Sequence, residues 1–196
     1  MNATAINTNI TSLAAYLEQQ VEGFAGPLSL EKFPGGQSNP TYLVTAASGQ
    51  YVLRSKPPGE LLASAHAVDR EYRVLTALAD TDVPVARALH LCEDEAVFGA
   101  MFYLMSYEQG RIFWDPALPE VSRDLRRPML EEQVRVLAAM HSVDIDAVGL
   151  SDYGRAGNYY ERQISRWTKQ YRAAETENLV DMETLMEWLP ENIPPR

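Results

Sequence analysis

The stretch LSLEKFPGGQSNPTYLVTAASGQYVLRSK, residues 28–56, decides how the first half of this chain folds. Three short runs are rich in apolar residues, and turn-forming residues separate them, which is the pattern of β-strands. The three predicted strands are Leu28–Phe33, Thr41–Ala46 and Tyr51–Arg54. Gly35 and Gly36 allow a tight first connection, and Ser48-Gly49 provides the second turn. We therefore expect a three-stranded antiparallel meander.

Helical and strand periodicities continue on both sides of this stretch. An amphipathic helix precedes it, from about Asn9 to Val21, with Asn9 or Thr11 as its cap and Gly23 as its stop. The elements expected after it are a helix over Ser64–Leu78, strands over Val85–Cys92 and Ala96–Met105 joined by the acidic turn Glu93–Glu95, and helices over Met129–Met140, Asn158–Tyr171 and Asn178–Leu189. The predicted fold class is α+β, with a five-stranded antiparallel sheet and one helix inserted after the third strand. The lack of βαβ alternation argues against a Rossmann-type sheet.

The character of the chain changes at the end of the last predicted strand. Residues 1–106 are predicted to form a small β-rich lobe, and residues 111–196 form helices and loops of a second lobe. The segment between them, residues 107–110, ends in Glu108-Gln109-Gly110 and is predicted to be a hinge.

Composition limits the compartment and the partners. The 196 residues carry a net charge of −10, with a pI near 4.8, which argues against a nucleic-acid-binding surface. An acidic surface favours a cationic partner, or serves solubility alone. The chain has one cysteine, Cys92, and shows no secretory signal or membrane-spanning apolar run, so we expect a cytoplasmic protein without a membrane partner.

A phosphate site is predicted where the meander meets the next helix. Gly35-Gly36-Gln37-Ser38-Asn39 offers backbone N–H groups and short polar side chains to an anion. Arg54 ends a strand, and Glu71 follows seventeen residues later in a predicted helix. Lys56 is an alternative phosphate-contacting cation, and a solvated Arg54 with Glu71 paired to Arg70 or Arg73 is the plainer interpretation. The order of glycine loop, strand cation and helix glutamate matches the arrangement with which kinases hold ATP phosphates.

Several runs together resemble the aminoglycoside phosphotransferase and choline kinase-like superfamily, and most closely its branch of stand-alone phosphotransferases and modules fused to acyl-CoA dehydrogenases. The runs are Phe33–Asn39, Tyr51–Arg54, Asp69–Tyr72, Met140–Asp144 and Gly149–Asn158. The resemblance implies a protein-kinase-like fold and transfer of phosphate from ATP, with Mg²⁺, to a small-molecule hydroxyl. It further implies that Arg54 contacts phosphate, that Glu71 is its ion-pair partner, and that Met105, Tyr107 and Gly110 belong to an adenine-facing hinge. Arg54 stands where the kinase pattern has lysine, which leaves the nucleotide geometry open.

The catalytic loop implied by the resemblance is not found among these residues. The family pattern has His-Gly-Asp, with an Asn five residues beyond the Asp, and then a second Asp for magnesium. His141-Ser142-Val143-Asp144 is a decoy, because position 149 is Gly. Asp152-Tyr153-Gly154 follows Asp144 too closely to be the magnesium motif, and the three histidines lack metal-site spacing. We therefore assign no catalytic residue and no metal ligand, and expect a chain that stops before the catalytic loop and is inactive alone.

A second hypothesis comes from a different functional class. The chain could serve as a non-catalytic nucleotide-binding or scaffolding module, whose apolar helical face around Leu185, Met186, Trp188 and Leu189 favours a partner or a dimer. The acceptor is left open among aminoglycosides, choline-like amines and hydroxylated acyl groups. The acidic balance favours a cation, whereas the dehydrogenase-fused branch favours a hydroxyacyl compound.

Overall fold

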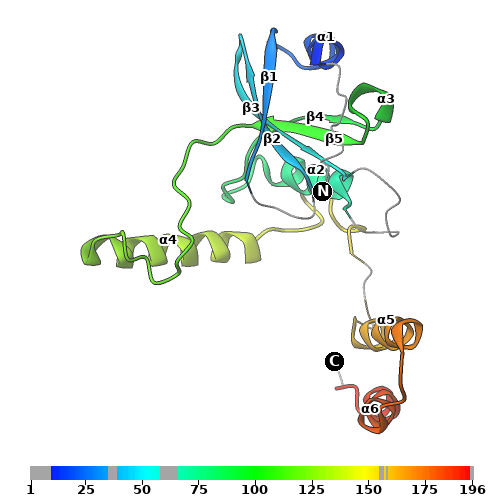
Figure 1. Ribbon diagram of the computed structural model, residues 1–196. Helices are drawn as coiled ribbons and strands as arrows, with labels where there is room; N and C mark the ends of the chain where they lie inside the picture. The colour runs from blue at the N-terminus through cyan, green and yellow to red at the C-terminus, as the bar shows by residue number, and fades with distance from the viewer. Residues whose placement is uncertain (1–9, 35–38, 58–65, 155–156, 158, 195–196) are drawn as a thin grey trace. The chain divides into compact units, whose positions relative to one another are not determined.

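The computed structural model describes residues 10–34, 39–57, 66–154, 157 and 159–194 (Figure 1). The chain divides into two compact units, residues 1–150 and 151–196. The described elements of the first are α1 (Ile10–Gln20), β1 (Leu28–Lys32), β2 (Thr41–Ala46), β3 (Gly49–Ser55), α2 (Val68–Leu78), β4 (Ala88–Cys92), α3 (Glu95–Phe98), β5 (Phe102–Ser106) and α4 (Arg123–His141). Those of the second are α5 (Tyr159–Ala174) and α6 (Val180–Glu191).

The predicted five-stranded sheet is confirmed. Its strands lie in the order β1-β2-β3-β5-β4, and every neighbouring pair is antiparallel. The first three strands form the meander expected from residues 28–56, and α2 follows the third strand as predicted. The last two strands reverse their order in the sheet, so β5 rather than β4 lies beside β3. This exchange brings the end of β5 next to the strand that carries Arg54.

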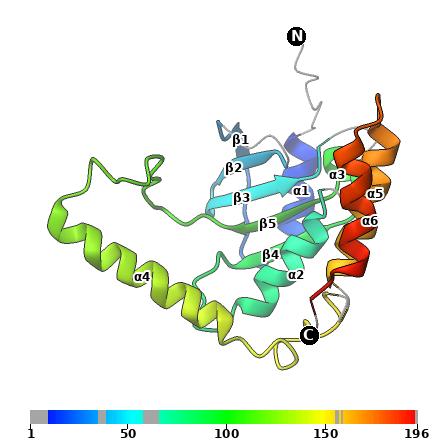
Figure 2. The same ribbon diagram turned by 90° about the horizontal axis from the view of Figure 1, so that it is seen from below.

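One face of the sheet forms the apolar core under α1. Leu13 and Leu17 of α1 are fully buried, and they belong to the same core cluster as Leu53, Phe102 and Leu104 of the central strands. Because side chains alternate along a strand, the intervening residues of β3 and β5 point to the opposite face. Helix α2 contacts β4 and β5, and Figure 2 shows α1 and α2 on opposite sides of the sheet.

The helix predicted from Ser64 begins later. Helix α2 starts at Val68, and Ser64 lies outside the described residues. His66 has a φ of 59°, in the left-handed region, and a residue in that conformation cannot continue a right-handed helix. The apolar periodicity could not show this break, because it depends on the backbone of a single residue.

The strand predicted over Ala96–Met105 is also wrong in its first half. Glu95–Phe98 forms the short helix α3, and the strand covers only Phe102–Ser106. The Asp94 side chain accepts a hydrogen bond from the N–H of Ala96, and Gly99, at a φ of 84°, ends the helix. Asp94 of the expected acidic turn is therefore the N-cap of α3.

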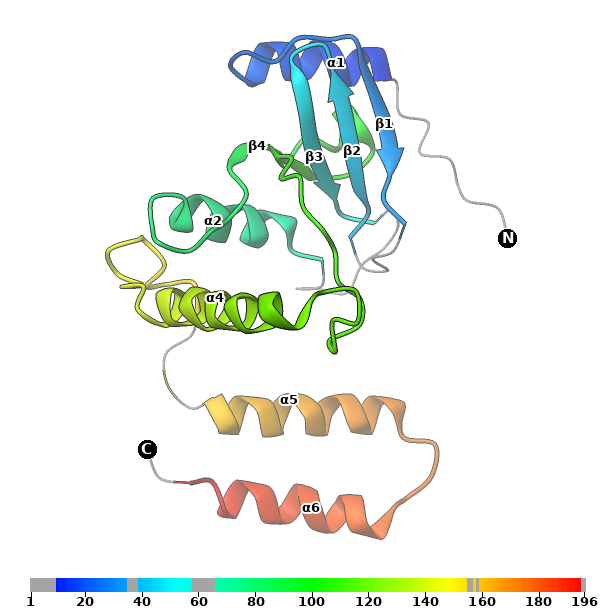
Figure 3. The same ribbon diagram turned by 90° about the vertical axis from the view of Figure 1, so that its left-hand side faces the viewer.

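The helical half of the prediction is largely confirmed, with shifted ends. Helix α4 begins at Arg123, well before the predicted Met129, and continues through Pro128. The N–H groups of Leu125 and Arg126 bond to the carbonyl of Ser122 and form the first turn of the helix. Pro128 has no N–H and therefore cannot bond to the carbonyl of Asp124 one turn earlier. Helices α5 and α6 run side by side as an antiparallel hairpin (Figure 3), and the predicted start at Asn158 lies outside the described residues. No helix in the described part of the chain is long and apolar enough to cross a membrane.

Replacing Gly23 with Ala is expected to lower the free energy of unfolding by about 1–2 kcal/mol. Gly23 has a φ of 76° after α1, and a Cβ built there meets nothing within 4 Å, so the cost comes only from the backbone conformation. Urea denaturation measures the change. Gly110→Ala is the matched control: its Cβ is also unobstructed and its φ lies outside the left-handed region, so no loss is expected. Equal losses in the two variants would contradict the prediction.

Candidate functional site

A row of polar side chains crosses the sheet on the face opposite α1. Thr41 of β2 lies directly opposite Arg54 of β3, and Arg54 lies directly opposite Tyr103 of β5. Residues opposite each other on antiparallel strands point to the same face, so the three side chains form one row under α2. The Arg54 Nη1 group donates to Thr41 Oγ1 over 3.0 Å.

Glu71 of α2 accepts hydrogen bonds from this row. Its Oε2 accepts from Arg54 Nε at 2.6 Å and from the Tyr103 hydroxyl at 3.1 Å. Its Oε1 accepts from Asn39 Nδ2 at 2.9 Å, while Arg54 Nη2 lies 3.5 Å away. The Arg54–Glu71 ion pair expected from the sequence is therefore present. The nearby Arg73 donates to the carbonyl of Gly149.

Tyr103 is a buried donor in this network. Only 3% of the residue is exposed, and burial, together with the adjacent Glu71 carboxylate, raises the pKa of Tyr103 far above its usual value. The phenol therefore keeps its proton at neutral pH and donates a hydrogen bond to Glu71. This bond ties β5 to α2 beside the ion pair.

Arg54 keeps hydrogen-bonding capacity for a ligand. A guanidinium has five N–H groups, and contacts with Thr41 and Glu71 account for three of them among the described residues. Its side chain is 31% exposed, so an added anion can approach the guanidinium. A fixed, always-charged fork of this kind is suited to a phosphate oxygen.

Asn39, predicted to lie near phosphate, uses its side chain within the protein. The residue is only 5% exposed. Its Oδ1 lies 2.9 Å from Nδ1 of His66, while its Nδ2 donates to Glu71. Its carbonyl accepts from the Thr41 hydroxyl at 3.1 Å. The other four residues of the predicted phosphate loop, Gly35, Gly36, Gln37 and Ser38, lie outside the described residues.

The remaining candidates lie along β5 and at the end of β3. Met105 is paired with Val52, and both Met105 and Tyr107 are half-buried, while Gly110 is exposed. Lys56 follows β3, and its backbone N–H donates to the carbonyl of Met101. Their assignment to an adenine-facing hinge or a phosphate contact stays a prediction.

The residues of the His141–Asp144 run make contacts within their own part of the chain. His141 is the exposed last residue of α4. The Asp144 carboxylate accepts hydrogen bonds from the N–H groups of Asp146 and Ala147, so it caps its own turn. Among the described residues, no group of three or more His, Cys, Asp or Glu side chains could hold a metal ion.

Sequence reasoning missed three members of the network: Thr41, His66 and Tyr103. Thr41 could have been found by pairing the predicted strands of the meander, because its position opposite Arg54 follows from the turn at Gly49. Tyr103 required the register of β3 with β5, which are far apart in the chain. His66 gave no signal, since its place depends on a left-handed backbone conformation.

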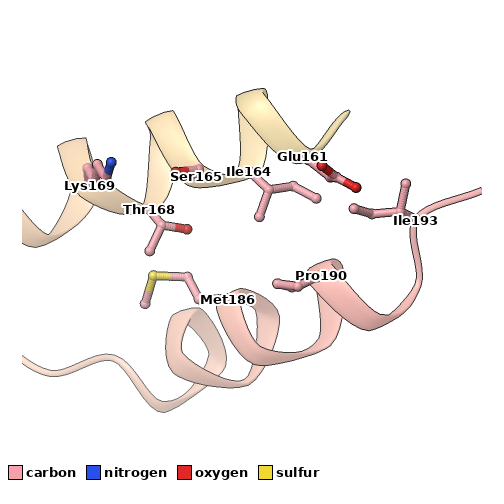
Figure 4. Close-up of a pocket in the computed structure, with 8 residues that line it drawn as sticks. All are labelled: Glu161, Ile164, Ser165, Thr168, Lys169, Met186, Pro190 and Ile193. Carbon is pink, nitrogen blue, oxygen red and sulfur yellow. The ribbon is translucent and has the colours of Figure 1, made fainter. Parts of the chain in front are cut away.

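The second unit contains a separate cavity. About 480 Å³ lies between α5 and α6, where Ile164 and Thr168 face Met186 and Pro190 (Figure 4). Glu161 and Lys169 lie at its ends. Its lining combines apolar side chains with Glu161, Ser165, Thr168 and Lys169, and we assign it no role.

Comparisons with known proteins identify the family of this chain. The model of the phosphotransferase enzyme family matches residues 29–196. Acyl-CoA dehydrogenase family member 10 of Mus musculus is 46% identical over 183 residues, which are 91% of this chain and 17% of that protein. Probable acyl-CoA dehydrogenase IBR3 of Arabidopsis thaliana is 47% identical over 195 residues, 93% of this chain and 24% of that protein. The chain thus spans a quarter or less of these relatives.

A solved structure is similar over nearly all of the chain. The crystal structure of a proposed aminoglycoside phosphotransferase from Ralstonia eutropha JMP134 is 52% identical in sequence and superposes with a TM-score of 0.75. The match covers 94% of this chain and 53% of that one. The five-stranded sheet with its helices is therefore the α+β, kinase-like fold of that protein.

Proposed function

This chain belongs to the phosphotransferase enzyme family, and we propose that it supplies the ATP-binding part of a small-molecule phosphotransferase. The observation that carries this proposal is the Arg54–Glu71 ion pair, which holds a guanidinium at the end of β3 with two N–H groups left over. In kinases a strand cation paired to a helix glutamate contacts the phosphates of ATP. Arg54 takes that role here, and Glu71 orients it.

The predicted lobes give the rest of the nucleotide site. Residues 1–106 form the nucleotide-binding lobe, with Gly35–Asn39 on the phosphate side, and residues 107–110 form the hinge beside the adenine. Residues 111–196 form part of a helical lobe for the acceptor. The acceptor is a small molecule with a hydroxyl group, and the likeness to dehydrogenase-fused relatives favours a hydroxyacyl compound over an amine.

ATP titration of the chain, followed by isothermal calorimetry, tests the proposal. Saturable binding is expected, and Arg54→Ala is expected to weaken it about ten- to a hundredfold, because hydrogen bonds to charged groups contribute about 1.5–3 kcal/mol each. Arg135→Ala is the matched control, since it removes a guanidinium that pairs with Glu132 on its own helix. No saturable ATP binding, or equal affinities for wild type and Arg54→Ala, would overturn the proposal.

Phosphoryl transfer by these residues alone is not expected. The sequence has no His-Gly-Asp run, and Asp144 Oδ1 accepts two hydrogen bonds from its own turn. Loss of a general base alone typically slows an enzyme about 10²–10⁴-fold. Mg²⁺ belongs to the family reaction, but we assign it no ligand among the described residues. ATP turnover that persists in Asp144→Ala and Asp152→Ala and disappears in Arg54→Ala would show that another residue serves as the base.

The alternative, a non-catalytic module that associates with a partner, draws on one observation. Helices α4, α5 and α6 have no buried residues, and large apolar side chains such as Val134 and Trp188 are more than half exposed. Surfaces of this kind are typical of interfaces. Light scattering and thermal melts with and without ATP test this alternative. A monodisperse monomer whose melting temperature does not change with ATP would argue against both association and nucleotide binding.

A further inference from the structure

We propose that Asn39 is a positioning residue, which fixes the Glu71 carboxylate so that Arg54 presents its remaining N–H groups to phosphate. This inference rests on the proposed function, because it concerns the same site. Asn39 does so from a buried position, where water does not compete for its side chain.

The orientation of the Asn39 amide follows from its neighbours. A carboxylate can only accept hydrogen bonds, so the NH₂ group of Asn39 must face Glu71. The amide oxygen then faces His66 Nδ1, at 2.9 Å, and because an amide oxygen also only accepts, this ring nitrogen must carry a hydrogen. His66 therefore donates to Asn39, and Asn39 donates to Glu71. The bond from His66 keeps the amide from turning over.

The two oxygens of Glu71 are held in different ways. Oε2 has two donors at short distance, Arg54 Nε and the Tyr103 hydroxyl. Oε1 has one short bond, from Asn39 at 2.9 Å, because Arg54 Nη2 lies at 3.5 Å, the limit of a hydrogen bond. Asn39 is therefore the residue that fixes the rotation of the carboxylate about its last bond.

Asn39 also reaches the other partner of the ion pair. Its carbonyl accepts from the Thr41 hydroxyl, and the oxygen of that hydroxyl accepts from Arg54 Nη1. One residue thus contacts Glu71 directly and Arg54 through a single hydroxyl. Because ligand contacts tolerate only small errors of position, a guanidinium held at both ends binds phosphate better than one held only by its ion pair.

Two readouts on the same protein test the proposal, ATP affinity by calorimetry and ¹⁵N NMR of the Arg54 Nε–H and His66 ring signals. In wild type we expect slow exchange of the Arg54 Nε–H with water and a hydrogen on His66 Nδ1. Asn39→Ala should speed that exchange and weaken ATP binding about tenfold, the effect of about 1.4 kcal/mol. Asn39→Asp keeps the acceptor for His66 but places a carboxylate against Glu71, so it should be at least as damaging.

Tyr16→Phe is the matched control, because it removes a half-buried hydrogen bond to His90 and should leave both readouts unchanged. If wild type does not bind ATP but Asn39→Ala still speeds the Arg54 exchange, the proposed function fails and the positioning role stands. If wild type binds ATP, and either Asn39 variant matches it in affinity and in Arg54 exchange, the positioning role is overturned. Should Asn39→Ala not fold, the Asn39→Asp variant and the His66 ring signal of wild type test the positioning role. A His66 Nδ1 without a hydrogen in wild type overturns that role.

Discussion

Glu71→Ala is expected to lower the free energy of unfolding by about 2–4 kcal/mol. The change leaves two buried donors, the Asn39 amide and the Tyr103 hydroxyl, without their acceptor. Each unsatisfied buried polar group costs about 1–3 kcal/mol. Arg54 loses its ion pair as well, so ATP affinity should fall together with stability. Urea denaturation measures the first effect, and calorimetry measures the second.

The control for this prediction is Glu132→Ala. Glu132 also pairs with an arginine, Arg135, but both side chains are more than half exposed, and an ion pair of this kind contributes little. No measurable change in stability is expected. If Glu71→Ala were as mild as Glu132→Ala, the hydrogen-bond network around Glu71 would not exist in solution.

Phe102→Ala is expected to cost about 3–5 kcal/mol of unfolding free energy, the usual range for removing a buried aromatic ring. Phe102 is fully buried in β5, and its ring contacts those of Phe98, at 5.4 Å between centroids, and Tyr16, at 6.5 Å. These contacts join α1 and α3 to the sheet. A cavity there loosens the strand that also carries Tyr103, so the urea midpoint should shift strongly.

Trp114→Ala provides the comparison for Phe102. Trp114 is 83% exposed, so its removal takes away surface rather than core, and its effect should stay within about 0.5 kcal/mol. A Phe102 variant with the same small effect would mean that the core under α1 does not pack as described.

The strands and helices were predictable where the pattern is local. The meander over residues 28–56 and the helices α1, α5 and α6 follow from apolar periodicity and from turn residues, and both are read within a short window. The errors lie where one residue controls the backbone, as at His66 before α2 and at Asp94 and Gly99 around α3. No periodicity records such a local conformation.

The site divides in the same way. The order of glycine loop, Arg54 and Glu71 was readable because each type of residue has a place in a chain pattern. Their neighbours were not, because Tyr103 reaches Glu71 only through the pairing of β5 with β3, and that pairing joins residues about fifty positions apart. Asn39 was predicted to face phosphate, and only the folded chain shows its side chain bonded to Glu71 and His66.

The sequence by itself determined the α+β fold and the cation and glutamate of the candidate site. Short-range alternation dictates which face of a strand is apolar, and Arg54 had to project from the face that Leu53 does not occupy. Only the tertiary structure decided what fixes that cation. Strand register and the packing of α2 bring Thr41, Asn39, His66 and Tyr103 around the ion pair, and distances set by long-range packing cannot be read from local sequence.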